Sequence, residues 1–340
     1  MKDFKEYKKL NEPNKKGKRE NWQTAIGLQA VDGLKPSKYL METAKENING
    51  NISIYEVQER LNRYYKEKPV ENTNLNTEEA DKVSARIIEI LNDKSFSFSP
   101  IELITIHKKL FIELLGGQNS KAKAGIIRDY NISKEEWVLN GASVCYASAN
   151  SIMPTLEYDF NQEKSFDYKN LDKRHMVEHI AQFTSNLWQI HPFGEGNTRT
   201  IAVFIIKYLR ALGLDINNEY FGKNSWYFRN ALVRANYNDH KHYVYATFKY
   251  LNNFFENLLF GSKHELKNRD LKIYIKDNPY TKQETVLSMI KEDHKITAAI
   301  LSKKLNKGIA TVKRELKRLK DNGYISRIGS DKTGSWKILK

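Results

Sequence analysis

Two apolar helical patterns joined by a short loop restrict the fold of this chain more than any other feature. Residues 171–190 repeat apolar side chains at helical spacing, and four of them are expected to face inward: Met176, Ile180, Phe183 and Leu187. A second apolar helix is expected to begin near residue 197. Similar patterns occupy 77–92, 99–115, 224–236 and 240–260. The chain is therefore expected to be mostly α-helical.

The segment at 124–160 departs from this helical pattern. Two short runs that favour β-structure flank the pair Asn140-Gly141, and an Asn-Gly pair is a strong signal for a tight hairpin turn. We therefore expect a β-hairpin inserted among the helices.

Length and composition limit the class of protein. At 340 residues the chain is long enough for two or three domains. The single cysteine, Cys145, excludes an internal disulfide and a zinc ribbon. No run of roughly 20 apolar residues suggests a membrane span, and the N-terminus lacks the apolar core of a secretory signal. We expect a cytoplasmic protein with no membrane partner.

The net charge of +15 is concentrated at the two ends of the chain. Residues 281–340 hold 15 Lys and Arg against 6 Asp and Glu, and residues 1–20 hold 8 against 4. A short basic segment on a nearly neutral body is typical of a nucleic-acid-binding appendage, although a solvated Lys-rich surface gives the same composition.

The loop between the two apolar helices carries residues suited to phosphate chemistry. A helix N-terminus directs backbone N–H groups at an anion, and Gly194 and Gly196 allow a phosphate to approach the backbone. Arg199 can neutralise a phosphate, Glu195 can ligate Mg²⁺, and His191 can accept a proton from an attacking hydroxyl. Each residue also has an ordinary structural interpretation, and only their combination favours a site.

The segment His191-Pro-Phe-Gly-Glu-Gly-Asn-Thr-Arg199 resembles the signature of the Fic family, with Thr198 as the departure. The resemblance covers roughly residues 80–260. It implies a helical Fic fold that uses ATP and Mg²⁺ to transfer AMP to a Ser, Thr or Tyr hydroxyl of a target protein. His191 would be the base and Glu195 the Mg²⁺ ligand.

The resemblance also implies roles for residues around the motif. Gly194, Gly196, Asn197, Thr198 and Arg199 would bind the nucleotide phosphates, and Asn236 would face the adenine. The hairpin would be a flap that docks the target segment by strand pairing through Ser143, Val144, Cys145 and Tyr146. Arg229 stands where an aromatic residue often lies, which leaves the identity of the base open.

Three further departures from the family concern regulation. Ala202 replaces the second arginine of the signature, which holds the γ-phosphate and anchors an inhibitory glutamate in many members. The N-terminal run around residues 27–37 resembles the antitoxin helix of the family, with Leu28 and Asp32 at its Ser and Glu positions. We therefore expect this form of autoinhibition to be weak or absent, and a different nucleotide remains open.

The C-terminal residues have the pattern of three helices followed by two strands, which is the order of a winged helix-turn-helix. Four basic residues lie outside the apolar stripe of its third helix and are expected to contact DNA: Lys313, Arg314, Lys317 and Arg318. The stripe itself is expected to contain Ile309, Val312, Leu316 and Leu319. Docking to a protein, or dimerisation, is the alternative role for this domain.

The sequence thus predicts a mostly α protein with a Fic fold, a β-hairpin flap and a winged helix. The expected parts are a basic mobile tail at 1–20, an antitoxin-like helical segment at 21–70, a Fic domain at 77–262, a linker at 263–280 and a winged helix at 281–340. The expected function is protein adenylylation, with DNA as a second partner. The alternatives are a nucleotide-sensing transcriptional regulator with an inactive Fic core and transfer of another nucleotide or of phosphate. The oligomeric state stays open, a homodimer included.

Overall fold

The computed structural model of the chain describes residues 12–67, 75–116, 120–273, 279–305, 308–321, 323–329 and 334–339. The chain divides into two compact units. The larger contains Met1–Asn238 and Tyr245–Ile273, and the smaller contains Asp239–Val244 and Tyr274–Lys340. In the described parts, no helix is both long enough and apolar enough to cross a membrane.

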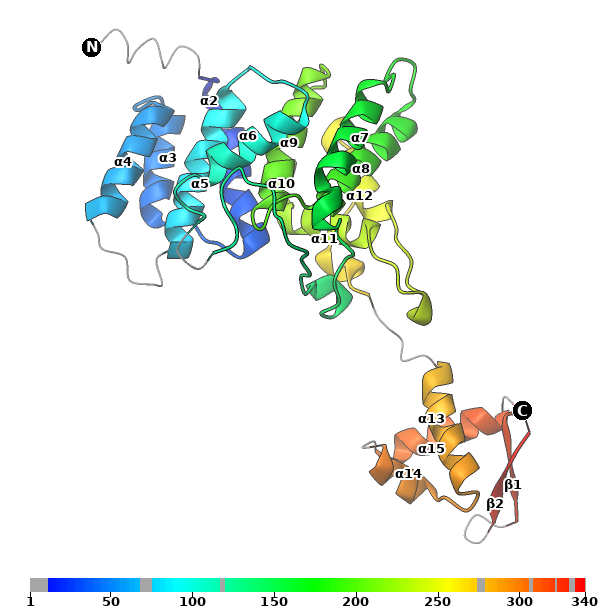
Figure 1. Cartoon of the computed structure of the whole chain (residues 1–340). Helices are drawn as coiled ribbons and strands as arrows, with labels where there is room; N and C mark the ends of the chain where they lie inside the picture. Colours follow the sequence, from blue (N-terminus) through cyan, green and yellow to red (C-terminus); the bar gives the residue numbers. More distant parts are fainter. Residues whose placement is uncertain are drawn as a thin grey trace. The chain divides into compact units, whose positions relative to one another are not determined.

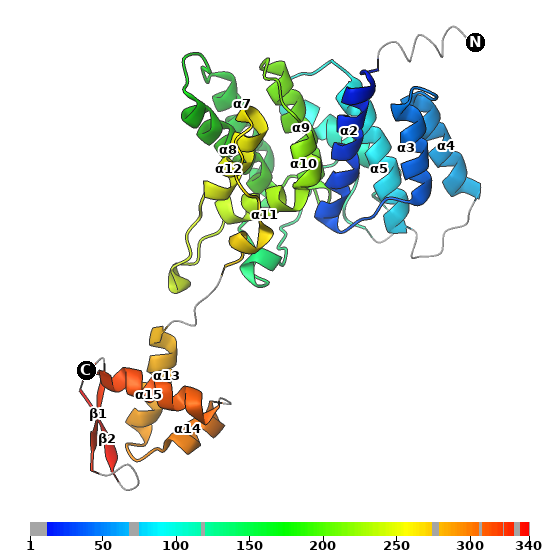
Figure 2. The same cartoon turned by 180° about the vertical axis from the view of Figure 1, so that it is seen from behind.

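The larger unit is built from helices. They are α2 (Lys15–Gly27), α3 (Lys38–Ile48), α4 (Ile54–Glu67), α5 (Leu75–Asn92), α6 (Pro100–Phe111), α7 (Ile152–Lys164), α8 (Lys173–Ile190), α9 (Asn197–Ala211), α10 (Glu219–Lys223), α11 (Ser225–Ala235) and α12 (Lys249–Phe260). Short 3-10 turns join them: η1 (Leu28–Asp32), η3 (Trp137–Leu139), η4 (Ala149–Ser151) and η6 (Asn268–Leu271), whereas η5 (His240–His242) lies in the segment assigned to the smaller unit. In this unit α3 and α4 lie at one end and α7 and α8 toward the other, with α2, α5 and α9 between them (Figures 1 and 2).

The N-terminal helices pack into the same core as the rest of the larger unit. Helices α2 and α10 cross so closely that a Cβ on Gly27 would lie 2.1 Å from the carbonyl oxygen of Gly222. Near the crossing, the Thr24 hydroxyl donates to the carbonyl of Asn218 at 2.7 Å, and the Ser225 hydroxyl donates to that of Gly27 at 2.7 Å. The N-terminal segment that contains α2 is therefore an integral layer of this unit.

The start of α2 corrects the expectation of a mobile tail over residues 1–20. The helix begins at Lys15, where the Asn14 side chain accepts a hydrogen bond from the Gly17 amide at 2.9 Å. Lys18 is buried and pairs with Glu12 at 2.6 Å. The tail prediction fails over these residues because an Asn cap and a buried ion pair produce no apolar stripe. Residues 1–11 lie outside the described part of the chain.

The helix predictions agree with the structure apart from details. The expected helices at 77–92, 171–190 and 224–236 correspond to α5, α8 and α11, whereas the one at 240–260 begins only at Lys249 because 240–242 form η5. On α8 the expected Ile180, Phe183 and Leu187 are buried, but Val177 takes the inward place expected for Met176.

The β-hairpin predicted within 124–160 is wrong: the described residues there form no strand. Asn140 and Gly141 do make a tight turn, with positive φ values of 54° and 93°. The Val138 carbonyl, however, accepts a hydrogen bond from Ile273 at 2.8 Å, and η3 replaces a strand. Consecutive Val138 and Leu139 are both buried, so the alternation that a strand needs is absent there.

The smaller unit has the predicted order of three helices and two strands. They are α13 (Pro279–Glu292), α14 (Ala298–Lys304), α15 (Ile309–Asp321), β1 (Ile325–Ile328) and β2 (Ser335–Ile338). The strands pair antiparallel, with Ile325 opposite Ile338. Its core contains Val286, Ile290, Ile296, Leu301, Val312, Leu316, Leu319 and Ile325. Ile309, expected in the buried stripe, is 47% exposed because it lies at the first position of α15.

Candidate active site

His191 ends α8 and is buried beside the loop. It adopts the left-handed conformation (φ 49°), which turns the chain out of the helix and into residues 192–196. Its ring packs against Trp188 and Tyr146, and the residue is only 3% exposed. Nδ1 lies 3.1 Å from the Trp188 carbonyl oxygen, which can only accept, so Nδ1 carries the proton and Nε2 keeps its lone pair.

Burial is the main cause that lowers the pKa of His191 well below its ordinary value, and the nearby charge of Lys134 acts in the same direction. At neutral pH the His191 ring is therefore a neutral imidazole, which is the form that can accept a proton.

Arg128, which the sequence analysis missed, fixes the end of α8. Its guanidinium donates to the carbonyls of His191 at 2.8 Å and Ile190 at 3.2 Å, and also to those of Tyr130 and Ala147 at 2.6 and 2.5 Å. Carbonyls at a helix C-terminus lack intrahelical partners, and a cation there satisfies them. A buried arginine far from the motif in sequence gives no local signal, so only the tertiary structure identifies it.

The side chains of Asn197 and His107 fix the conformation of the loop at 192–196 through contacts with Phe193 and Glu195. The Asn197 side chain accepts from the Phe193 amide at 3.0 Å and donates to the Phe193 carbonyl at 2.7 Å. His107 stacks on the Phe193 ring with a centroid distance of 3.7 Å, and its Nε2 donates to the Glu195 carbonyl at 3.1 Å. Burial lowers the pKa of His107 to about 4. Asn197 is therefore a bracing residue of the loop rather than a group facing outward.

The turn into α9 leaves a row of backbone donors free. Within the described residues, the N–H groups of 194–199 donate to no protein acceptor. Gly196 enables this turn, because it has a positive φ of 72° and a Cβ there would lie 2.4 Å from the Phe111 ring. Gly194 packs against Tyr130 and Ala122, and the Thr198 hydroxyl accepts from Trp188 Nε1 at 3.0 Å. Free N–H groups at a helix N-terminus form an anion site.

Glu195 points toward solvent and pairs with Lys134, which belongs to residues 134–147, here called the flap segment. Its side chain is 55% exposed, and Oε2 lies 3.3 Å from Nζ of Lys134. Among the described residues no group of three or more His, Cys, Asp or Glu side chains could hold a metal ion. A single carboxylate is still compatible with Mg²⁺, which is commonly bound by one carboxylate together with substrate phosphates and water.

Arg199 is buried and enclosed by side chains of other elements. Its Nε lies 2.7 Å from Asp32 Oδ2 in an ion pair, although the N–H is not directed at that oxygen as in a hydrogen bond. Nη2 pairs with Glu79 at 2.6 Å, and Nη1 donates to Gln29 at 3.0 Å. The guanidinium also lies over the Phe111 ring, 4.7 Å from its centroid.

This arrangement gives the N-terminal segment a contact with the motif. With Ala202 in place of a second arginine, the acidic residue of the N-terminal segment pairs with the first arginine of the motif instead. The expectation that autoinhibition of the family's form is weak or absent stays a prediction, and the contact with Arg199 is a feature that the sequence alone did not indicate.

The flap segment has no regular secondary structure over 142–147 and contacts His191 through the Tyr146 ring. Val144 and Tyr146 are buried, while Cys145 is exposed and Ser143 is half-buried. Its end is attached to α8, because the Ala147 amide donates to the Gln189 carbonyl at 3.3 Å and Gln189 Nε2 donates to that of Cys145 at 3.2 Å. The side chains of Val144 and Tyr146 therefore face the protein.

Asn236 caps the end of α11 and reaches α8. Its Nδ2 donates to the Ser185 hydroxyl at 2.8 Å and to the Leu232 carbonyl at 2.9 Å. The amide nitrogen is thus engaged within the protein, and only its oxygen has no hydrogen-bond partner among the described residues.

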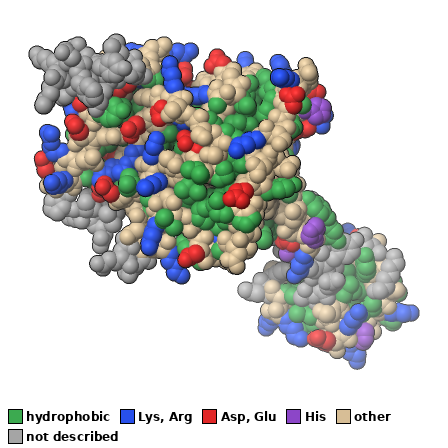
Figure 3. Space-filling view, turned by 45° about the horizontal axis from the view of Figure 1, so that its top comes forward, with side chains coloured by type: hydrophobic (Ala, Val, Ile, Leu, Met, Phe, Trp, Pro, Cys, Tyr) green, Lys and Arg blue, Asp and Glu red, His purple; other side chains and the backbone are tan. Residues whose placement is uncertain are grey.

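Helix α15 presents basic side chains on its outer surface. Lys313, Arg314 and Lys317 are exposed, and the side chain of Arg318 lies outside the described ones. The face of the smaller unit seen in Figure 3 carries Lys and Arg side chains with few acidic ones. The three described residues therefore lie where a nucleic acid could reach them.

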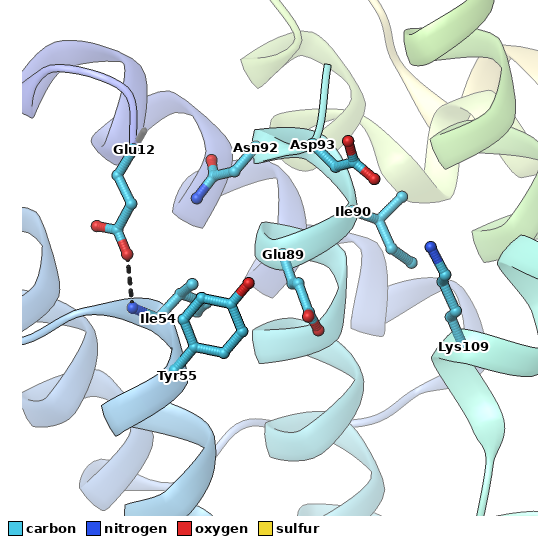
Figure 4. Close-up of a pocket in the computed structure, with 8 residues that line it drawn as sticks. All are labelled: Glu12, Ile54, Tyr55, Glu89, Ile90, Asn92, Asp93 and Lys109. Atoms are coloured by element: carbon cyan, nitrogen blue, oxygen red, sulfur yellow. Dashed lines mark hydrogen bonds between the residues drawn. The ribbon is translucent and has the colours of Figure 1, made fainter. Parts of the chain in front are cut away.

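One pocket, of about 220 Å³, lies away from the loop, between α4, α5 and the start of the described chain (Figure 4). Glu12, Glu89, Asp93 and Lys109 line it together with Tyr55. None of its lining residues belongs to the motif. Glu12 is already engaged there, since it accepts from the Ile54 amide at 2.7 Å.

Residues 97–209 match the Fic/DOC family. A comparison with curated proteins found no match. Among solved structures, the chain is similar to the N-terminal FIC domain of the Bep8 protein from Bartonella sp. 1-1C, with 20% identity over 57% of this chain and 88% of that one and a TM-score of 0.42.

Two other solved structures are similar at the same level. The BepC protein from Bartonella tribocorum, with bound AMPPNP, is 19% identical over 55% of this chain and 87% of that one, with a TM-score of 0.41. A Fic family protein from Desulfovibrio desulfuricans G20 is 13% identical over 94% of this chain and 87% of that one, with a TM-score of 0.42.

Proposed function

We propose that this protein is an adenylyltransferase, which moves AMP from ATP to a Ser, Thr or Tyr hydroxyl of a target protein. The observation that carries the proposal is the neutral His191 ring, with its Nε2 lone pair available, at the start of a loop whose N–H groups are free. A proton acceptor beside an anion site is what attack of a hydroxyl on a phosphate requires.

In the proposed reaction, the target oxygen forms a bond to the α-phosphorus while its proton passes to His191 Nε2. The bond between the α-phosphorus and the oxygen bridging to the β-phosphate breaks, and pyrophosphate leaves. The N–H groups of 194–199 would hold the phosphate oxygens and stabilise the charge that develops on them. Loss of the proton acceptor should reduce the rate by about 10²-fold or more.

Glu195 is the residue that would hold Mg²⁺, which when bound offsets the charge of the phosphates. Its exposed carboxylate and the neighbouring free N–H groups fit a metal held jointly by protein and nucleotide. When nucleotide and Mg²⁺ bind, the ion pair between Lys134 and Glu195 would break, and Lys134 could then contact a phosphate. Arg199 could contact a phosphate only after its ion pairs with Asp32 and Glu79 open.

The backbone of the flap segment favours a protein as the substrate that is modified. Within the described residues, the N–H groups of Val144, Cys145 and Tyr146 donate to no acceptor. A segment with free backbone N–H groups can pair with a strand of another chain, which would place a target hydroxyl beside the base. Ser143 and Cys145 would then face that strand.

For the smaller unit we propose a winged helix that binds DNA through Lys313, Arg314, Lys317 and Arg318. The exposed positions of the three described residues and the charge of +9 over 281–340 support this role. A nucleotide-sensing regulator remains the second candidate function, because Arg199 already has partners in this structure.

Incubation of the full chain with Mg²⁺ and ATP labelled at either the α- or the γ-phosphate tests the proposal. We expect label on protein from the α-position alone. His191→Ala should abolish it, whereas His175→Ala, on the exposed first turn of the same helix, should not. Label from the γ-position would indicate phosphate transfer, and binding of ATP without any label would favour the sensing regulator.

A further inference from the structure

A buried ion pair connects the flap segment to α11. Glu136 is fully buried, and both of its carboxylate oxygens are bound by Arg229, at 2.6 Å through Nη1 and at 3.0 Å through Nη2. Arg229 lies on α11, and its guanidinium packs over the Trp226 ring, 5.3 Å from the centroid. This two-point contact fixes both the distance and the orientation of the flap relative to α11.

Tyr146 connects the ion pair to His191, the proposed base. The Tyr146 hydroxyl donates to Glu136 Oε1 at 3.2 Å, and the Tyr146 ring lies 4.2 Å from the His191 ring between centroids. An unbroken series of contacts therefore runs from Arg229 through Glu136 and Tyr146 to His191.

Three contacts surround the His191 ring. The hydrogen bond from Nδ1 to the Trp188 carbonyl fixes which nitrogen is protonated, and the rings of Trp188 and Tyr146 pack against the imidazole. Of these, Tyr146 ties the ring to Glu136 of the flap segment. A displacement of about 1 Å at a proton acceptor is enough to slow a reaction by about 10²-fold.

A buried ion pair such as Glu136–Arg229 adds little net free energy to folding, so stability does not explain its presence. Removing two opposite charges from water offsets most of their attraction, and apolar residues of similar volume often replace a buried pair without loss. What a bidentate pair provides is a defined relative position of its two side chains. Here Glu136 is the fixed side chain, and its contact with Tyr146 connects that position to the His191 ring.

We propose that Glu136, Arg229 and Tyr146 form a latch that holds the flap on α11 and positions His191 to accept the proton. This inference rests on the proposed function, since it assigns positioning residues to that site. Arg229, which stands where the family often has an aromatic residue, then acts through the flap and not by stacking on the base of the nucleotide.

The test uses the double variant Glu136→Gln/Arg229→Met in the full chain, because removing both charges leaves no unpaired ion in the core. Glu46→Gln/Arg60→Met is the matched control, since it removes an exposed Arg–Glu pair of 2.8 Å. Thermal unfolding shows whether each variant folds. If the double variant does not fold, Tyr146→Phe removes only the hydroxyl link and takes its place.

Two measurements follow on the folded variants. The first is the rate of labelling with α-labelled ATP, expected to fall about tenfold or more while the half-saturating ATP concentration changes less than about twofold. The second is NMR titration of the His191 ring, assigned with His191→Ala, in protein with labelled histidine. This titration uses Tyr146→Phe, which removes the hydroxyl link without changing a charge, because loss of the Arg229 charge by itself raises the pKa of His191. Loosening the flap should reduce the burial of the ring and raise the pKa of His191 toward its ordinary value. Arg229→Lys, which keeps the charge, should give an intermediate labelling rate.

The two readouts separate this inference from the proposed function. If the unmodified protein transfers no AMP, the proposed function fails, and the titration still tests whether the latch positions the ring. If a folded latch variant keeps the labelling rate and the His191 titration of the control, the latch is overturned. A fall in the rate of the control variant as large as that of the latch variant would overturn it as well.

Discussion

Asp32 of the N-terminal segment and Arg199 of α9 form an ion pair of 2.7 Å across 167 positions of sequence. The guanidinium is almost fully buried, whereas a third of the Asp32 side chain is exposed. The aspartate thus closes the open side of a pocket whose other walls are Gln29, Glu79 and the Phe111 ring. In this conformation the charge of Arg199 is neutralised within the protein.

Replacing this aspartate should free Arg199 for a phosphate. Asp32→Asn keeps the shape and removes one of the two carboxylates, so we expect ATP to bind about three to ten times more tightly and labelling to increase. Calorimetric titration with ATP and Mg²⁺ measures the affinity. Glu178→Gln, which removes an exposed ion pair on α8, is the control and should change nothing. Equal affinities of Asp32→Asn and the control would show that Arg199 does not contact the nucleotide.

Arg128 should be required for the geometry of the loop. Arg128→Met leaves the carbonyls of Ile190, His191, Tyr130 and Ala147 without this donor, and we expect a decrease of about 2–4 kcal/mol in the free energy of unfolding. Arg128→Lys should recover part of it. Urea denaturation followed by circular dichroism measures both. A Met variant as stable as the unmodified chain would rule out this role.

His107 should make the stability of the larger unit depend on pH. Burial lowers its pKa from the ordinary 6.5 to about 4, so between these values the unfolded chain binds more protons than the folded one. The stabilisation is complete above about pH 6.5 and should fall by up to about 3 kcal/mol as the pH decreases to 4.

The variant His107→Gln isolates this contribution, because it retains an N–H donor for the Glu195 carbonyl but does not titrate. Urea unfolding at pH 7.5 and pH 4.5 gives the difference in free energy for each protein. We expect the difference to be smaller in the variant. The same difference in both proteins would assign the pH dependence to other groups, His191 among them.

Binding of DNA by the smaller unit should be electrostatic. We expect the full chain to bind a random duplex at low salt, with an affinity that falls steeply as salt is added. Lys313→Ala/Lys317→Ala should weaken binding and reduce the salt slope by about one unit for each phosphate that is no longer neutralised. Lys164→Ala/Lys169→Ala removes two exposed lysines of the larger unit and is the matched control. Fluorescence anisotropy of a labelled duplex at several salt concentrations measures the affinity of each protein. Absence of binding at low salt would favour a role of the smaller unit in docking to a protein.

The helices and the loop that joins α8 to α9 follow from the sequence without any knowledge of the fold. Apolar spacing placed Ile180, Phe183 and Leu187 inside, and the residues of the motif lie at the junction of the two helices as their pattern predicts. These signals are local, since a helix and its cap depend on residues a few positions apart.

Which charges meet depends on the tertiary structure alone. Arg128 reaches His191 across 63 positions, Arg229 reaches Glu136 across 93, and Arg199 meets both Asp32 and Glu79. Burial then determines the protonation state of His191 and the need of the buried cations for partners. It keeps His191 neutral, and each buried cation needs an acceptor because an unpaired buried charge is costly. The expected hairpin failed for the same reason, because packing of Val138 and Leu139 against the core outweighed the local preference of the Asn140-Gly141 turn for paired strands.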